Sequence, residues 1–146
     1  MMTDVTLNER EQTIRQQVAA QGFMTLIGAE LGKLTRGTCE MSVLKRPELL
    51  QQHGMFHGGV TAFLVDNSTT IAASTMTQQG QTVLTAEYKL SLFSPGFGER
   101  LVCRARVIKA GKTLSVVAAD VFSVTGADEK HTATALATIA VIAAKE

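Results

Sequence analysis

The chain has 146 residues, the size of one ordinary domain, and 45% of them are hydrophobic, which is enough for a well-formed core. Its 14 basic and 13 acidic residues leave a formal net charge of +1, so it lacks the basic field of a nucleic-acid-binding protein. No apolar run is long enough to span a bilayer, and the polar N-terminus is unlike a signal peptide. We therefore expect a single cytoplasmic domain over residues 1–146 with no membrane partner.

The first part of the chain is expected to contain one helix and one strand. Glu, Gln and Arg residues with apolar positions between them predict a surface helix over residues 6–20, with Thr6 as its N-cap and Glu9 completing a capping box. Residues 21–33 contain several glycines and are expected to be broken by turns. The alternation of side chains over residues 34–43 predicts a strand.

A long apolar helix and four strands are expected in the rest of the chain. The helix is predicted over residues 57–77, and its mostly apolar surface must be covered on nearly all sides. Alternating runs separated by Gly-containing turns predict strands over residues 81–93, 101–110, 113–125 and 131–144. Because consecutive strands usually pair, we expect an antiparallel meander that curves around the helix, an α+β fold.

Cys39 and Cys103 fall in strand-like segments without metal-type spacing, so we expect two buried free thiols in a reducing compartment. His53 and His57 are four residues apart, but a predicted loop intervenes and no third ligand is near in sequence, so no metal site is expected. The chain has no Gly-x-Ser-x-Gly motif and no Gly-rich dinucleotide or P-loop pattern, and no cofactor is implied.

Asp66 lies in the middle of the apolar helix and is the most informative residue. Ala62, Asp66 and Thr70 are spaced four apart and share one stripe of that helix. A carboxylate among apolar neighbours is costly to bury and has two interpretations. Either it points into a cleft and performs chemistry, or it is solvated or paired with an arginine.

The helix begins at His57-Gly58-Gly59, where backbone N–H groups have no partner within the helix. Because glycine has no Cβ, a ligand can approach closely, and the Gly58 N–H at the positive helix end is suited to polarising a carbonyl oxygen. The two glycines fit equally well a structural role in helix entry. His57 is either a general base or a residue that holds the loop by binding backbone groups.

Basic residues recur along the late strands, where they comprise Lys89, Arg100, Arg104, Arg106, Lys109 and Lys112. Most of them are expected on solvated strand faces and turns. A few, with Arg104, Lys109 and Lys112 as candidates, are expected to contact the phosphates of a nucleotide-bearing substrate.

The segment His57-Gly58-Gly59-Val60, followed by Leu64-Val65-Asp66-Asn67, resembles the hotdog-fold acyl-CoA thioesterases of the phenylacetate-pathway (PaaI-like) type and the thioesterase superfamily member 2-like group. The resemblance covers roughly residues 32–142. It implies an antiparallel sheet of five or six strands wrapped around one long central helix, in addition to the N-terminal helix. It also implies a homodimer, or a dimer of dimers, in which each active site lies between two subunits.

The resemblance further implies roles for individual residues. Asp66 corresponds to the catalytic carboxylate, which acts as nucleophile or as general base for water. Gly58 corresponds to the glycine whose N–H polarises the thioester carbonyl, and Gly59 beside it is expected to contact the substrate. Gln51 corresponds to a loop Asn or Gln that contacts the thioester or the attacking water.

Three more residues have roles implied by the same resemblance. His57 corresponds to the motif histidine, which usually orients the loop. Thr85 or Thr70 corresponds to a Ser or Thr that positions water, since subgroups differ in which element provides it. The implied reaction is hydrolysis of an acyl-CoA to free acid and CoA, without a metal or redox cofactor.

Two alternatives to hydrolysis share the fold. An acyl dehydratase usually carries a different, Pro-containing motif, which is not present here, and a non-catalytic acyl-CoA-binding protein tends to lack the helix carboxylate. The acyl group itself is not indicated by the sequence. The apolar residues that fit either an acyl pocket or the core are Met55, Phe56, Phe63, Met76 and Leu84.

Overall fold

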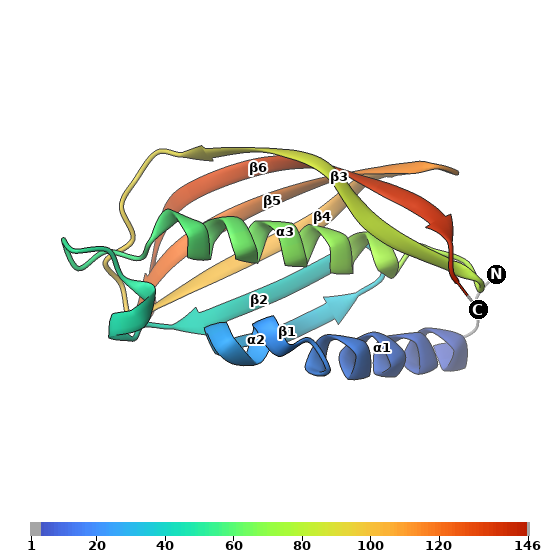
Figure 1. Cartoon of the computed structure of the whole chain (residues 1–146), viewed down its shortest axis with the longest axis horizontal. Coiled ribbons are helices and arrows are strands. Elements are labelled where there is room, and N and C mark those ends of the chain that lie inside the picture. The colour runs from blue at the N-terminus through green and yellow to red at the C-terminus, as the bar shows by residue number, and fades with distance from the viewer. Residues whose placement is uncertain (1–3, 146) are drawn as a thin grey trace.

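The structure is a computed structural model that describes residues 4–145, with side chains from residue 8 onward. Its elements are α1 (Asp4–Ala19), α2 (Gly22–Ile27), β1 (Ala29–Thr35), β2 (Thr38–Leu44), the short 3-10 helix η1 (Pro47–Leu49), α3 (Gly58–Ser74), β3 (Gln81–Leu92), β4 (Arg100–Ala110), β5 (Leu114–Thr125) and β6 (Asp128–Ala143). In Figure 1, α3 lies along a curved sheet, and α1 and α2 lie beside β1.

The six strands form one antiparallel sheet in the order β1-β2-β4-β5-β6-β3. This confirms the expected hotdog arrangement of a sheet around a long helix. The predicted meander of four consecutive strands is wrong in one respect. Strands β4, β5 and β6 follow one another as expected, but β3 pairs with β6. Because β3 forms the edge beyond β6, strands lie along both flanks of α3 and cover more of its apolar surface.

The single strand predicted over residues 34–43 is in fact the end of β1, a turn and β2. Thr35 pairs with Thr38, so only Arg36 and Gly37 form the loop, and Gly37 has a φ of +81°. Leu34 pairs with Cys39 and both are buried, so the alternation of side chains changes phase at the turn, whereas one continuous strand would place these two residues on opposite faces. The prediction of irregular turns over residues 21–33 likewise missed α2 and the first part of β1.

The two helix predictions differ from the structure at their ends. Helix α1 already includes Asp4, so the prediction that Thr6 is its N-cap is wrong. Helix α3 ends at Ser74, three residues before the predicted end at residue 77. There the Arg10 guanidinium of α1 donates to the Ser74 carbonyl oxygen at 2.7 and 3.1 Å and also binds the Thr77 hydroxyl. A cation at the negative helix end stabilises α3 and anchors α1.

Helix α3 packs on the inner face of the sheet against β2, β3, β4, β5 and β6. Its buried residues recur in pairs about four apart, which places them on one side of the helix: Val60, Thr61, Leu64, Val65, Ser68, Thr69, Ile71, Ala72 and Ala73. The facing residues of β6 include three buried alanines, which let the helix approach closely: Ala133, Ala135 and Ala137. Among residues 4–145, no helix has both the length and the apolarity needed to cross a membrane.

The two edges of the sheet differ in their protection. Strand β1 contacts α1 and α2, and the Arg15 side chain donates to the Gly32 carbonyl oxygen at 2.9 Å. Strand β3 is 12 residues long, and within the described chain its outer edge has no strand partner. Leu84, Tyr88 and Leu92 of β3 are exposed large apolar side chains. A long apolar edge of this kind pairs readily with another chain.

Cys39 and Cys103 are free and buried, as predicted. Burial raises the pKa of Cys103 to about 12, and a 3.0 Å contact with the Ser68 hydroxyl only partly offsets this effect. Burial also raises the pKa of Cys39 well above that of an exposed thiol. Since the thiolate is the reactive form, both cysteines are chemically protected in the folded state.

The folded protein is therefore expected to resist a thiol-specific disulfide reagent at mildly alkaline pH, whereas the protein in guanidinium chloride reacts fully. Unfolded thiols ionise near their ordinary pKa of about 8.5 while the folded thiols stay protonated, so the free energy of unfolding should fall as the pH rises above that value. Spectrophotometric thiol titration checks the first statement, and urea unfolding at several pH values checks the second. Rapid labelling of the folded protein by the disulfide reagent would contradict the expected protection of the two thiols.

Candidate active site

Asp66 lies on the one side of α3 that the sheet leaves open. The residues of this side are partly exposed and follow the helical repeat: Ala62, Phe63, Asp66, Asn67 and Thr70. Asp66 and Thr70 face β3, whereas Phe63 and Asn67 face α2. The carboxylate is therefore neither buried in the core nor paired with an arginine among the described residues, and it is partly exposed on this open side of the helix.

The Asp66 carboxylate is held by a threonine from another element. The Thr85 hydroxyl of β3 donates to Asp66 Oδ1 at 2.6 Å. The Thr70 hydroxyl lies 2.8 Å from Thr85 Oγ1 and 2.8 Å from the Asp66 carbonyl oxygen. One carboxylate oxygen is thus fixed by Thr85. Within the described chain, the other oxygen has no partner and is available to a substrate or a water molecule.

A β-bulge gives Thr85 this orientation. Thr85 pairs with the fully buried Ile139, so it points to the inner face of the sheet, toward α3. The register shifts between Thr85 and Glu87, and Glu87 then pairs with Thr138 on the outer face, where the Thr138 hydroxyl donates to it at 2.5 Å. Bulges that direct a side chain are frequent beside active sites. The sequence resemblance named Thr85 or Thr70, and the structure joins both to Asp66.

The beginning of α3 is capped by His57. Its backbone is extended, and its Nδ1 accepts from the Gly59 N–H at 2.8 Å. The Gly59 N–H is therefore already used, which leaves it unsuited to bind a carbonyl oxygen directly. The Gly58 N–H, by contrast, donates to no acceptor among the described residues. This arrangement favours the loop-holding role of His57 over a role as general base, because the Nδ1 lone pair is occupied.

Gly58 and Gln51 line the same cavity, whose volume is about 460 Å³. The loop that carries Gln51 is held by its own backbone, since the Gln51 N–H donates to the Met55 carbonyl oxygen at 2.9 Å. The cavity also contains apolar side chains, among them Leu92 and Phe93. Asp66 is not among its lining residues.

The site residues therefore form two separate groups within one chain. Asp66, Thr70 and Thr85 lie halfway along α3, while Gln51 and Gly58 lie at its beginning. Gly58 and Asp66 are eight positions apart in one helix, which corresponds to about 12 Å along its axis at 1.5 Å per residue. A single carbonyl group cannot contact both groups of the same chain.

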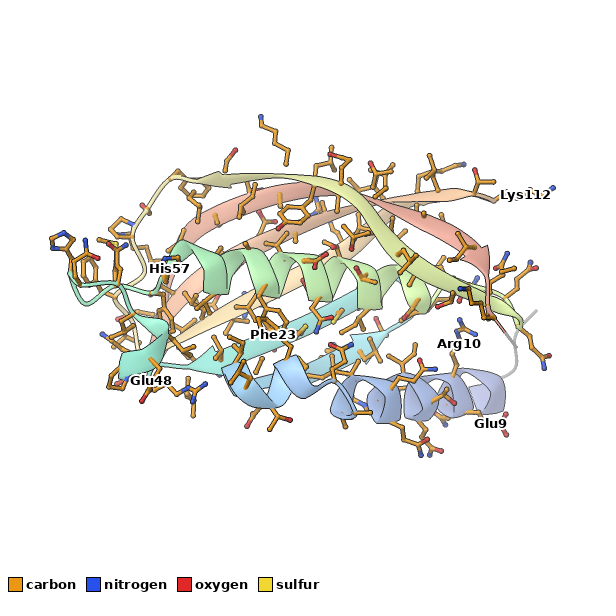
Figure 2. The ribbon with its side chains drawn as sticks, viewed as in Figure 1. Glu9, Arg10, Phe23, Glu48, His57 and Lys112 are labelled. Carbon is orange, nitrogen blue, oxygen red and sulfur yellow. The ribbon has the colours of Figure 1, made fainter. Side chains whose placement is uncertain are left out.

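The candidate phosphate contacts lie elsewhere. Arg104 donates to Glu40 at 2.9 Å and to both oxygens of Glu129 at 2.8 and 2.5 Å. This bidentate pair raises the pKa of Arg104 and lowers the pKa of the exposed Glu129, so the guanidinium is already neutralised on the outer face of the sheet. Lys112 lies at the opposite end of the molecule from His57, as Figure 2 shows, and Lys109 is on the same β4–β5 hairpin.

No group of three or more His, Cys, Asp or Glu side chains suited to a metal ion is found in the part of the chain that the structure describes.

Comparison with known proteins identifies the family. Residues 53–130, which include every residue of the helix entry and Asp66, match the model of the thioesterase superfamily. Acyl-coenzyme A thioesterase 13 of Homo sapiens is 36% identical over 126 residues, covering 82% of this chain and 85% of the relative. The chain belongs to the thioesterase superfamily.

Two solved structures have a similar fold. A thioesterase family protein from Silicibacter pomeroyi superposes with a TM-score of 0.89 at 32% identity, covering 92% of this chain and 99% of that chain. The E. coli PaaI protein from the phenylacetic acid degradation operon superposes with a TM-score of 0.82, covering 92% and 94% of the two chains. Its identity of 18% supports the shared fold alone.

The cap at His57 is expected to stabilise the fold. Replacing His57 by Ala is expected to lower the free energy of unfolding by about 1 kcal/mol, because the Gly59 N–H loses its acceptor. His57→Asn should recover most of this loss, since Asn is among the strongest N-caps. Urea unfolding followed by circular dichroism measures both values. Equal stability of the wild-type and His57→Ala proteins would show that the hydrogen bond contributes nothing.

Proposed function

We propose that this thioesterase-superfamily protein hydrolyses an acyl-CoA to a free acid and CoA, and that Asp66 is its catalytic carboxylate. The observation that carries the proposal is the carboxylate on the open side of α3, with one oxygen held by Thr85 and the other free. A carboxylate in this state is a ready base or nucleophile. The similarity to a curated acyl-coenzyme A thioesterase supports the same substrate class.

Two routes to hydrolysis fit the same arrangement of Asp66 and Thr85. With Asp66 as general base, the free oxygen takes a proton from water while the water oxygen attacks the thioester carbon. With Asp66 as nucleophile, the free oxygen attacks the carbon, and water then hydrolyses the mixed anhydride. In both routes the C–S bond breaks and the CoA sulfur leaves as a thiolate, which takes up a proton.

The developing negative charge on the carbonyl oxygen requires a donor. The Gly58 N–H supplies one, because it has no partner within the described chain and lies at the positive end of α3. Gln51, in the same cavity, is placed to contact the thioester or the attacking water. Since Gly58 and Asp66 of one chain are about 12 Å apart, we propose that the site combines Asp66 and Thr85 of one subunit with Gly58 and Gln51 of another.

The unprotected edge of β3 supports such an assembly. It is long, apolar and adjacent to Thr85, whereas the other edge of the sheet is covered. Two copies related by a two-fold axis would cover both β3 edges with identical surfaces. A homodimer is therefore the smallest complete enzyme in this proposal, and a dimer of dimers is compatible with it.

For the CoA phosphates we propose contacts from Lys109 and Lys112, which form no ion pair among the described residues. The structure argues against Arg104 in this role, because phosphate binding would have to displace two glutamates.

Replacing Asp66 by Asn is expected to lower turnover of acyl-CoA at least 100-fold, about the scale of a lost catalytic base, while the fold is retained. The change preserves shape but removes the negative charge that both routes need. Release of CoA, measured with a thiol-reactive dye, reports the rate, and circular dichroism reports the fold. The buried cysteines keep the background of this assay low. Turnover like that of the wild type would exclude Asp66 as the catalytic group.

Replacing Thr85 by Val should lower kcat about tenfold or more with little change in KM, because the hydroxyl orients Asp66 and is not expected to bind the substrate. Thr85→Ser should restore most of the activity. Thr138→Val is the matched control, since it removes a hydroxyl–carboxylate hydrogen bond from the outer face of the same pair of strands. Equal losses in Thr85→Val and Thr138→Val would assign the effect to the sheet rather than to the site.

The role of the Gly58 N–H can be separated from the role of the glycine itself. A Cβ at Gly58 meets only Leu92 Cδ1, at an ordinary 3.6 Å, so Gly58→Ala should fold and retain the N–H. Gly58→Pro removes the N–H at a first-turn position where proline is favoured, after an extended His57. We expect Gly58→Pro to lower kcat about 100-fold and Gly58→Ala only slightly, in steady-state assays. Similar activity of the two variants would exclude this N–H as the carbonyl donor.

A further inference from the structure

The short helix α2 is held firmly beside the open side of α3. The Asn67 side chain donates to the Gln21 side-chain oxygen at 3.1 Å and contacts Met24 Sδ at 3.2 Å. Met24 is buried in the core, and the C-terminal end of α2 is closed by Gly28 and by the Arg46 guanidinium on the Leu26 carbonyl oxygen. Helix α2 is therefore a fixed wall next to Asp66, since Asn67 directly follows Asp66 in sequence.

This wall presents aromatic surface to the solvent. Phe23 of α2 points toward α3 in Figure 2, and its ring meets Phe63 edge to face, with the ring centroids 4.9 Å apart. Phe23 nevertheless remains 53% exposed, and the neighbouring Leu26 is exposed as well. Phe63 precedes Asp66 by three residues, so the aromatic pair lies within one helical turn of the carboxylate. Contiguous exposed apolar side chains mark a ligand or interaction site more often than exposed single side chains do.

The uncharged, apolar character of this surface suits the acyl end of the substrate and not the phosphates of CoA. Residues 21–27 contain no charged side chain, so they offer nothing to the phosphates of CoA. An alkyl or aryl group gains by covering Phe23 and Phe63, because this removes apolar area from water. Building on the proposed function, we infer that the Phe23–Phe63 pair binds the acyl group and makes the enzyme selective for apolar acyl chains long enough to reach it. An acetyl group is too short to cover a ring one helical turn from the reacting carbon.

The test compares acetyl-, butanoyl-, hexanoyl- and octanoyl-CoA as substrates. For the wild type, kcat/KM is expected to rise with chain length. In Phe23→Ala, kcat/KM for hexanoyl- and octanoyl-CoA should fall about tenfold, while the value for acetyl-CoA should change less than about twofold, because each covered methylene is worth a factor of about four. Phe97→Ala is the matched control, since Phe97 is also 53% exposed but lies in the loop before β4.

A binding measurement separates this inference from the proposed reaction. Calorimetry with hexyl-CoA, a thioether that cannot be hydrolysed, is performed on the Asp66→Asn protein with and without Phe23→Ala, and free CoA serves as reference. If Phe23→Ala weakens the binding of hexyl-CoA but not that of free CoA, the acyl contact is supported, whether or not the wild type hydrolyses thioesters. A wild type without thioesterase activity would overturn the proposed function instead.

Several results would overturn the acyl contact. One is an equal loss of kcat/KM for acetyl- and octanoyl-CoA in Phe23→Ala, and another is unchanged binding of hexyl-CoA by that variant. A third is that the dependence of kcat/KM on chain length is altered by Phe93→Ala, in the Gly58 cavity, and not by Phe23→Ala. If Phe23→Ala fails to fold, Phe23→Leu keeps apolar bulk without the ring. It should then show a smaller loss with the same dependence on chain length.

Discussion

The packing of α3 against the sheet is the constraint on which the other features depend. An apolar helix of 17 residues needs cover on most of its surface, and the sheet supplies it by curving and by placing β3 beyond β6. Only one side of the helix stays open, and that side carries Asp66. The burial that stabilises the fold thus also leaves the candidate carboxylate accessible, and it brings Thr85 of the edge strand to that carboxylate.

The geometry of a single helix limits what one chain can do. Gly58 with its free N–H and Asp66 with its free oxygen face different regions, because a straight helix keeps them about 12 Å apart. The same chain exposes an apolar edge strand next to Asp66, which a monomer would leave uncovered. Both features are explained together if a second copy covers the edge and brings its own Gly58 to the carboxylate. In an isolated subunit, the separation of Gly58 from Asp66 and the uncovered edge of β3 would remain unrelated.

Parts of this structure could be predicted from the sequence, for identifiable reasons. The apolar run around Asp66 and the His57-Gly58-Gly59 entry indicated α3 and its beginning, because helical periodicity and N-terminal caps are local signals. The two-residue turn at Gly37 was missed because the change of phase between Leu34 and Cys39 becomes clear only when their shared burial is known, and burial follows from tertiary packing. The pairing of β3 with β6 is a long-range contact, which no local pattern reports.

The candidate site residues were likewise predictable only in part. The resemblance named Thr85 or Thr70 as the residue that positions water, but the contact of Thr85 with Asp66 depends on the register of β3 with β6. Arg104 was a candidate phosphate contact until the structure placed two glutamates around it, since cross-strand partners cannot be read from composition. Phe23 had no sequence signal, because it lies in a segment in which only turns were expected. Its proximity to Phe63 follows from tertiary packing.

Subunit complementation between two inactive variants tests most directly whether the site is shared. Gly58→Pro and Asp66→Asn chains carrying different affinity tags are co-expressed, and the mixed dimers are isolated by both tags. A mixed dimer contains one site with both defects and one intact site, so it should show about half of the wild-type activity per dimer, although each parent is inactive. Mixed dimers as inactive as their parents, or a fully active monomer by light scattering, would contradict a site built from two subunits.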